Sequence, residues 1–123
     1  MLSSVLNWLA RRLRQRPELI PPLELPLAGF RHHRATGVWP FLHPGAVVEL
    51  KREPWNRHDS RAVAVYYRRD KLGYLPRSDN FTVARWLDQG RALSACIARL
   101  DEAAPSARRL LLRLELQQVS AGR

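Results

Sequence analysis

Apolar and polar residues alternate in short segments along most of this chain, and few folds accommodate such a pattern. In the segment 46–52, Ala46, Val48 and Leu50 fall on one face, while Glu49 and Lys51 fall on the other. Successive side chains of a β-strand point to opposite faces, so this segment is expected to be a strand with one buried and one solvated face. The same reasoning predicts further strands at 25–33, 61–67, 71–75, 93–100 and 109–116.

One helix is expected between the fourth and fifth of these strands. Residues 76–80 contain helix start signals, and Val83, Ala84 and Leu87 share one helical face. Gly90 follows at a position where glycine often ends a helix. The helix should close one end of the domain.

Six short strands with one or two helices favour a small, mainly β domain over residues 23–118, followed by a short tail at 119–123. A strongly twisted sheet of this size can wrap on itself into a barrel, which removes its exposed edges. The segment 34–45 is expected to be a long loop. Its Trp39 and Phe41 should cap the core, because large aromatic side chains are costly to leave in water.

Residues 1–22 differ from the rest of the chain and predict a short basic amphipathic helix followed by a proline-rich connector. Leucines recur at helical spacing, arginines crowd the end of the stripe, and prolines then force an extended chain. The helix could dock on the domain, bind a partner, lie on a membrane surface or fray and attract nucleic acid. Stable membrane association is not expected, because the stripe is short and membrane attachment usually needs a second signal.

The charge of the chain favours an anionic partner. The formal net charge is +10; of 21 basic residues only Lys51 and Lys71 are lysines, so the other 19 are arginines, which form planar, bidentate contacts with phosphate oxygens. Such a charge could also serve solubility alone. Cys96 is the single cysteine, is expected to act as a small buried hydrophobe, and fits a reducing, cytoplasmic compartment.

The segment 52–59 joins two expected strands and holds an unusual set of side chains. It contains opposite charges, a proline, an aromatic ring, an amide, an imidazole and a carboxylate. Such a segment is too polar for a core and too rich in specific side chains for an idle turn, so it is the expected functional loop. Arg52 and Glu53 are expected to brace it by pairing with each other.

Cations and flat rings in and around this loop predict a nucleic-acid surface. Guanidinium groups neutralise phosphates, and rings stack on bases at about 1–3 kcal/mol each. The candidate cations are Arg31, Arg57 and Arg77, and the candidate rings are His32, His58 and Trp55.

Asp59 does not fit a simple phosphate-binding patch, because a carboxylate repels a phosphodiester. Two roles are open for it. It could accept a hydrogen bond from a hydroxyl or a base amine, or it could cap its own turn by bonding backbone N–H groups near Ser60 and Arg61.

Catalysis has little support in the sequence, and no cofactor or metal is expected. Glu49 and Lys51 could form half of a Mg²⁺-dependent nuclease site, but no upstream aspartate completes it, and the two residues would share a solvent face anyway. None of the four histidines shows the paired spacing of a zinc motif. A catalytic triad and a glycine-rich phosphate loop are also lacking.

Several short motifs recur in the order found in one known family. The sequence resembles the HIRAN domain in its compact bacterial stand-alone form. The residues that carry the resemblance are Ala28 to His33, Arg52-Glu53-Pro54, Asn56, His58, Asp59, Ala62 to Val65, Leu72 to Arg77, Asn80, and Leu87 to Gly90. The resemblance covers about residues 25–100, with 116 as its outer bound.

The resemblance implies an OB-like barrel that binds the 3′ end of single-stranded DNA. By that resemblance, Asp59 would accept a hydrogen bond from the terminal 3′-hydroxyl, and His58 and His32 would occupy two stacking positions that hold tyrosines in eukaryotic members. Arg31, Asn56 and Arg77 would contact phosphate or hold the loop. His33, beside His32, is included in the candidate interface.

Together these observations predict a non-catalytic module that binds single-stranded or frayed DNA ends in repair or replication, associated with the nucleoid. Any processing would come from a helicase or nuclease partner in trans. Two alternatives stay open, namely a protein-interaction adaptor that uses the N-terminal helix and a Mg²⁺-dependent nuclease.

Overall fold

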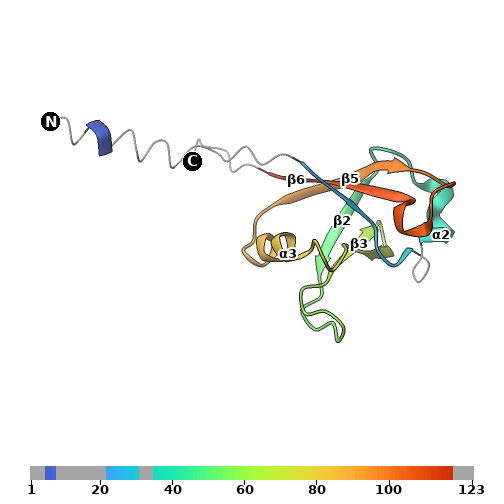
Figure 1. The fold of residues 1–123 in the computed structure, drawn as a ribbon, viewed down its shortest axis with the longest axis horizontal. Coiled ribbons are helices and arrows are strands. Elements are labelled where there is room, and N and C mark those ends of the chain that lie inside the picture. Colours follow the sequence, from blue (N-terminus) through green and yellow to red (C-terminus); the bar gives the residue numbers. More distant parts are fainter. Residues whose placement is uncertain (1–4, 8–21, 31–34, 118–123) are drawn as a thin grey trace.

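A computed structural model describes residues 5–7, 22–30 and 35–117, and shows one antiparallel sheet with strand order β1-β6-β5-β2-β3-β4 (Figure 1). Residues 5–7 are helical and exposed; the rest of the predicted N-terminal helix lies outside the described residues. The elements are β1 (Leu23–Pro26), α2 (Ala35–Val38), η2 (Trp39–Phe41), β2 (Val47–Arg52), β3 (Val63–Tyr67), β4 (Asp70–Tyr74), α3 (Phe81–Asp88), β5 (Leu93–Leu100), η3 (Ser106–Arg108) and β6 (Leu110–Leu116).

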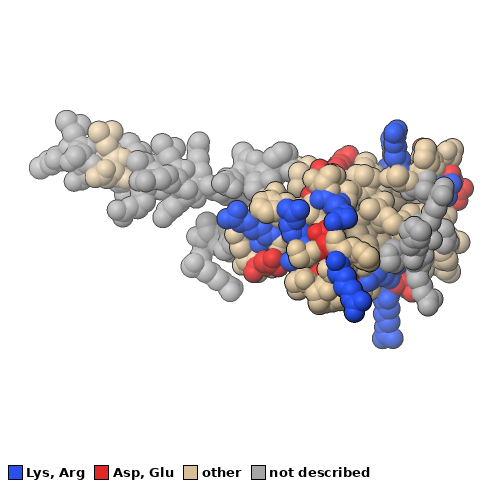
Figure 2. All heavy atoms as spheres, turned by 60° about the horizontal axis from the view of Figure 1, so that its bottom comes forward, with Lys and Arg blue, Asp and Glu red and all other residues tan. Residues whose placement is uncertain are grey.

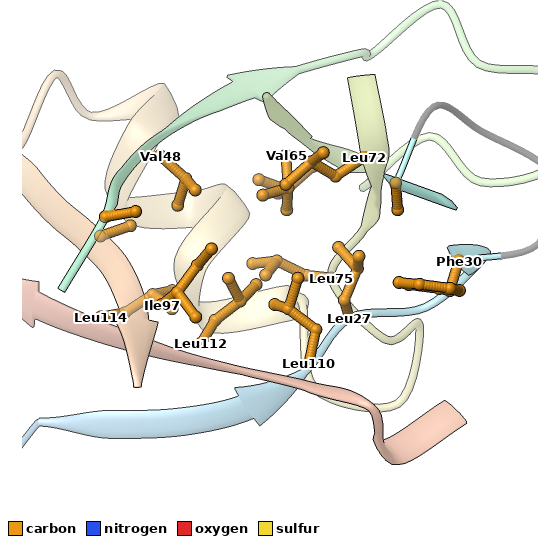
Figure 3. Packing of buried hydrophobic residues seen from close by; sticks show 14 of the residues in the cluster. Leu27, Phe30, Val48, Val65, Leu72, Leu75, Ile97, Leu110, Leu112 and Leu114 are labelled. Carbon is orange, nitrogen blue, oxygen red and sulfur yellow. The ribbon is translucent and has the colours of Figure 1, made fainter. Parts of the chain in front are cut away.

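The sheet curls into a half-barrel around a single apolar core. Of the residues predicted to point inward in 46–52, Ala46 and Val48 are buried and Leu50 is partly buried against the core. Buried side chains of β2 and β3 meet those of β5 and β6 (Figure 3). The largest fully buried side chains include Leu27, Val63, Val65, Leu72, Leu75, Ile97, Leu110, Leu112 and Leu114. The prediction of a small, mainly β, OB-like fold with six strands is confirmed.

The two edges of the sheet approach each other just after β1. The backbone of Ala28 exchanges two hydrogen bonds with that of Tyr74, at 2.8 and 2.9 Å, and so connects the chain after β1 to the end of β4. This contact is close because residue 73 is glycine: a Cβ atom there would collide with the carbonyl oxygen of Ala28.

The first strand is shorter than predicted. It was expected over 25–33, but β1 ends at Pro26, and the chain then leaves β6 for its bridge to β4. Gly29, with φ of +77°, then takes the chain out of the extended conformation. The end of the predicted strand, residues 31–33, lies outside the described residues.

The predicted loop 34–45 contains two short helical turns, α2 and η2. Trp39 packs edge-on against the buried Phe30, with ring centroids 5.5 Å apart, and its indole N–H donates to Glu102. Phe41 is 68% exposed, so the prediction that it caps the core is wrong. In a 3₁₀ turn, residues two apart point in different directions, so only one of these two rings faces the core.

The remaining elements follow the prediction closely. α3 begins after Asn80, buries Val83 and Ala84, and is followed by Gly90 with φ of +74°. β3 and β4, which correspond to the strands predicted at 61–67 and 71–75, pair as a hairpin, and β5 spans the expected residues 93–100. Cys96 on β5 is a free thiol and only partly buried, so the prediction that it is a buried hydrophobe is wrong. Across the described ranges, no helix is long and apolar enough to cross a bilayer.

Candidate nucleic-acid interface

The loop between β2 and β3 is anchored by the buried carboxylate of Glu53, which is only 4% exposed. Glu53 accepts hydrogen bonds from Lys71 Nζ at 2.7 Å, Tyr74 Oη at 2.9 Å and Asn56 Nδ2 at 3.1 Å. Burial raises the pKa of Glu53, but these three hydrogen bonds and the positive charge of Lys71 outweigh burial, so its net pKa lies below the ordinary value. Glu53 therefore stays ionised and ties the loop to β4.

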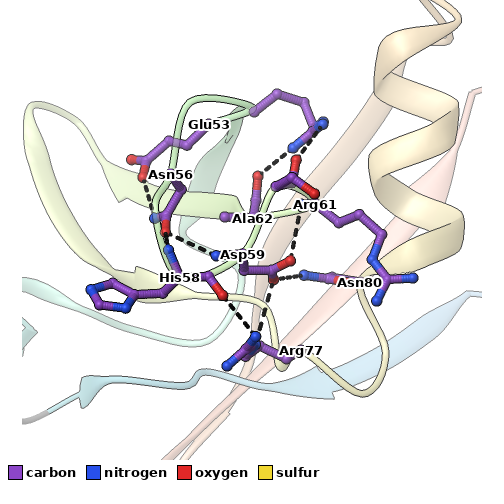
Figure 4. A network of polar contacts seen from close by, with 10 residues as sticks. Glu53, Asn56, His58, Asp59, Arg61, Ala62, Arg77 and Asn80 are labelled. Atoms are coloured by element: carbon purple, nitrogen blue, oxygen red, sulfur yellow. Dashed lines mark hydrogen bonds and ion pairs between the residues drawn. The ribbon is translucent and has the colours of Figure 1, made fainter.

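Asn56 connects Glu53 to the tip of the loop (Figure 4). Its Nδ2 donates to Glu53, while its Oδ1 accepts hydrogen bonds from the backbone N–H groups of His58 at 2.9 Å and Asp59 at 3.2 Å. A single amide thus links the buried carboxylate to the backbone that carries the two central candidate residues.

Asp59 uses both of its carboxylate oxygens inside the protein. Oδ1 accepts from the backbone N–H of Arg61 at 2.9 Å, and Oδ2 accepts from Asn80 Nδ2 at 2.7 Å. The guanidinium of Arg77 lies 4.0 Å from Oδ2. The suggestion that Asp59 caps its own turn is therefore confirmed for the Arg61 N–H. A carboxylate has about four lone-pair sites, so these bonds leave capacity for another donor.

The surroundings of Asp59 keep it ionised. Burial raises the pKa of the Asp59 carboxyl. The hydrogen bonds from Arg61 and Asn80 and the charges of Arg77 and Arg61 together lower it by more than burial raises it, so the net pKa lies below the ordinary value. Its side chain is 13% exposed. Asp59 thus presents a fixed negative acceptor, with little freedom to swing away.

Asp59 forms part of the wall of an open hollow of about 540 Å³, called here the end hollow. This volume is in the range of small-molecule sites. Its lining residues are Ala28, Gly29, Asn56, His58, Asp59, Ala62, Tyr74, Leu75 and Arg77. The Ala28–Tyr74 bridge therefore builds one wall of the hollow and the β2–β3 loop builds another.

Arg77 and His58 meet at the rim of the end hollow. Arg77 Nη2 donates to the backbone carbonyl of His58 at 2.7 Å, and its side chain is otherwise largely exposed. Figure 4 shows the imidazole of His58 pointing away from the Asp59 network. Arg77 thus holds the loop, and its side chain and that of His58 are both exposed to a ligand.

A second, shallower hollow of about 310 Å³ adjoins the end hollow, and is called here the Trp55 hollow. Trp55 and Arg57 line it, together with Glu53 and Lys71, and it shares Asn56, His58 and Tyr74 with the end hollow. The structure therefore brings Trp55, Asn56, Arg57, His58, Asp59 and Arg77 to one region. Arg31, His32 and His33 lie outside the described residues.

Arg52 and Glu53 do not pair with each other, which corrects the prediction. Arg52 instead pairs with Asp88 of α3 at 2.9 Å and donates to the carbonyl oxygens of Ser60 and Ala62. Neighbouring residues of a strand point to opposite faces, so one side chain reaches the helix and the other reaches β4. Both residues brace the loop, through different partners.

The sequence did not identify three residues of the site, namely Lys71, Tyr74 and Asn80. Lys71 served only to predict a strand, whereas Tyr74 and Asn80 also belonged to the motifs that carry the family resemblance, without a role in the site. Their signal was their polarity at the ends of elements that flank the functional loop. Pairing them with Glu53 and Asp59 requires the sheet register, which the sequence alone does not supply.

The structure gives no support to the nuclease and metal motifs considered in the sequence. Glu49 and Lys51 lie 4.0 Å apart on the solvent face of β2, as two residues of one strand face do. The part of the chain that the structure describes holds no group of three His, Cys, Asp or Glu side chains able to bind a metal. Figure 2 shows Lys and Arg side chains gathered on one face of the domain, with a few acidic side chains between them.

A curled, six-stranded antiparallel sheet with a polar loop at its rim defines an OB-like domain. The model of the HIRAN domain matches residues 22–117, and the chain belongs to this family. This confirms the resemblance seen in the sequence and extends it to all six strands of the sheet.

Two solved structures have the same fold. A crystal structure of a Lactobacillus plantarum protein is 28% identical, with a TM-score of 0.61, covering 77% of this chain and 97% of that one. The crystal structure of the HIRAN domain of human HLTF is 20% identical, also with a TM-score of 0.61, covering 77% of this chain and 74% of that one. No curated protein matches the chain.

Proposed function

We propose that this HIRAN domain binds the 3′ end of single-stranded DNA, and that Asp59 accepts a hydrogen bond from the terminal 3′-hydroxyl. The HIRAN domain is known as a DNA-binding domain in the family of human HLTF, which supports the choice of DNA. The net charge of +10 favours such an anionic partner.

The observation that carries the proposal is an ionised, firmly held carboxylate in the wall of a hollow rimmed by arginine. A phosphodiester at Asp59 would be repelled, whereas a hydroxyl can donate a hydrogen bond to it, and such charge-assisted bonds are strong. The 3′ terminus of a DNA strand ordinarily ends in a hydroxyl, whereas every interior 3′ oxygen belongs to a phosphodiester. The neighbouring Arg77 would neutralise the phosphate that precedes it.

The remaining residues have supporting roles. The exposed His58 ring stacks on a terminal base, while Asn56 and Arg77 hold the loop through the bonds described above. His32 is assigned the second stacking position and Arg31 a phosphate contact on the family resemblance. His33 stays a candidate contact. Nothing in these roles requires catalysis, so the domain acts as a binding module beside a helicase or nuclease partner in trans, in DNA repair or replication.

The proposal is tested by titrating the protein with three single-stranded oligonucleotides of the same sequence that end in a 3′-hydroxyl, a 3′-phosphate or a blocked 3′ carbon. Fluorescence anisotropy from a 5′ label reports Kd. Binding to the 3′-phosphate should be at least about tenfold weaker, roughly 1.4 kcal/mol, because it places negative charge beside Asp59. Equal affinity for the three ends would refute the role of Asp59.

A further inference from the structure

Trp55 lies at the tip of the β2–β3 loop and is 73% exposed, although it is the largest side chain of the loop. An exposed flat ring can stack on nucleic-acid bases with little regard to their sequence. Trp55 takes no part in the polar network that fixes the loop. Its ring is therefore accessible to a ligand.

The Trp55 hollow is contiguous with the end hollow. The two share Asn56, His58 and Tyr74, so these three side chains form the partition between them. A strand whose 3′ terminus occupies the end hollow can continue directly past His58 into the second hollow. The inference rests on the proposed function, because the end hollow fixes which nucleotide comes next.

The charges of the Trp55 hollow suit a strand with a phosphate backbone. Glu53 is the acid in its lining, and it is buried and paired with Lys71 at 2.7 Å, so its charge is offset. Arg57 makes no ion pair within the described ranges, which leaves its guanidinium available to phosphate. The hollow thus combines an exposed ring with an uncompensated cation.

We propose that the Trp55 hollow is a second nucleotide site, in which Trp55 stacks on one base upstream of those in the end hollow while Arg57 neutralises its phosphate. This site lengthens the bound strand without reading its sequence, since every base presents a flat face. It makes the affinity depend on a base in the interior of the strand as well as on the 3′ end.

The test combines an abasic scan with variants of Trp55. Single-stranded 3′-hydroxyl oligonucleotides carry one abasic site at successive positions inward from the end, and Kd is measured for wild type, Trp55→Ala and Trp55→Phe. Wild type should lose affinity about tenfold at one upstream position. Trp55→Ala should bind the intact strand about tenfold more weakly and be insensitive to the abasic site at that position. Trp55→Phe, which keeps a ring, should retain most of the affinity.

Phe41→Ala provides a matched control, because Phe41 is similarly exposed and lines neither hollow. It should bind like wild type, and thermal unfolding should show that each variant is folded. If Trp55→Ala binds the intact strand as tightly as wild type, or weakens it while keeping the wild-type abasic profile, the second site is refuted. Either result can occur while wild type still prefers a 3′-hydroxyl, so the proposed function is judged separately by that preference.

Discussion

Asp59 combines a structural and a proposed recognition role in one carboxylate. Its bonds to the Arg61 N–H and to Asn80 fix its position, and they also keep it ionised. A carboxylate held in this way has lost its side-chain freedom before a ligand arrives. Binding of a hydroxyl to it therefore costs little further conformational entropy. The bonds that make Asp59 look structural are therefore compatible with a role in binding.

Glu53 gives a prediction for stability at the residue scale. Replacing it in Glu53→Gln removes the ion pair with the partly buried Lys71 and should lower the free energy of unfolding by about 2 kcal/mol at neutral pH. Urea unfolding of both proteins provides the measurement. Glu115→Gln is the control, since Glu115 pairs with Arg113 at an exposed site, where an ion pair contributes at most about 1 kcal/mol.

The effect of Glu53→Gln should depend on pH. Because the pKa of Glu53 is lower in the folded than in the unfolded state, its ionisation stabilises the fold above the ordinary value of 4.5. That contribution is lost as the pH falls through the folded pKa, so the difference between wild type and variant should shrink there. A difference that stays constant from neutral to acidic pH would contradict the role of the Glu53 charge. The pH-dependent contribution of Asp59 to stability is the same in both proteins and therefore cancels in the difference.

At the scale of elements, the Ala28–Tyr74 bridge connects the fold to the site. It joins the chain after β1 to the end of β4, and both of its residues line the end hollow. Gly73 permits this close approach, so the wall of the hollow depends on a residue that does not itself line it.

Gly73→Ala should therefore reduce both stability and binding. Its Cβ atom would displace the carbonyl of Ala28, and overpacking of this kind typically costs about 1–3 kcal/mol. Denaturant midpoints and Kd for a 3′-hydroxyl oligonucleotide measure the two effects. Gly37→Ala in α2 is the control, because a Cβ atom there meets nothing within 4 Å. An unchanged midpoint and Kd for Gly73→Ala would show that the bridge is dispensable.

The elements themselves were largely predictable because their signal is local. The alternation in β2, β5 and β6, and the start and stop signals of α3, depend on residues next to each other in the chain. The end of β1 was not predictable in this way. It is decided by the switch from β6 to β4 after Pro26, which is a property of the assembled sheet.

At the scale of the whole molecule, the site is built from distant parts of the chain. Glu53 bonds residues 18 and 21 positions away, and Asp59 bonds a residue 21 positions away. The sequence identified the loop, and the family resemblance singled out Asp59 within it. The distant partners Lys71, Tyr74 and Asn80 came only from the register of the curled sheet, which places β4 and the start of α3 beside the loop.

The central claim, that Asp59 reads the 3′-hydroxyl, is tested most directly by comparing Asp59→Asn with wild type on 3′-hydroxyl and 3′-phosphate oligonucleotides. Asparagine keeps an oxygen for the Arg61 N–H, and Asn80 can turn its unpaired Oδ1 toward the new amide, so the variant should fold. Asp101→Asn is the control, because Asp101 makes a similar turn bond to the Ala103 N–H and lines neither hollow. The ratio of the two Kd values should be at least about tenfold in wild type and Asp101→Asn, and should fall close to one in Asp59→Asn. A ratio that is unchanged in a folded Asp59→Asn would contradict the assignment of Asp59 as the residue that reads the end.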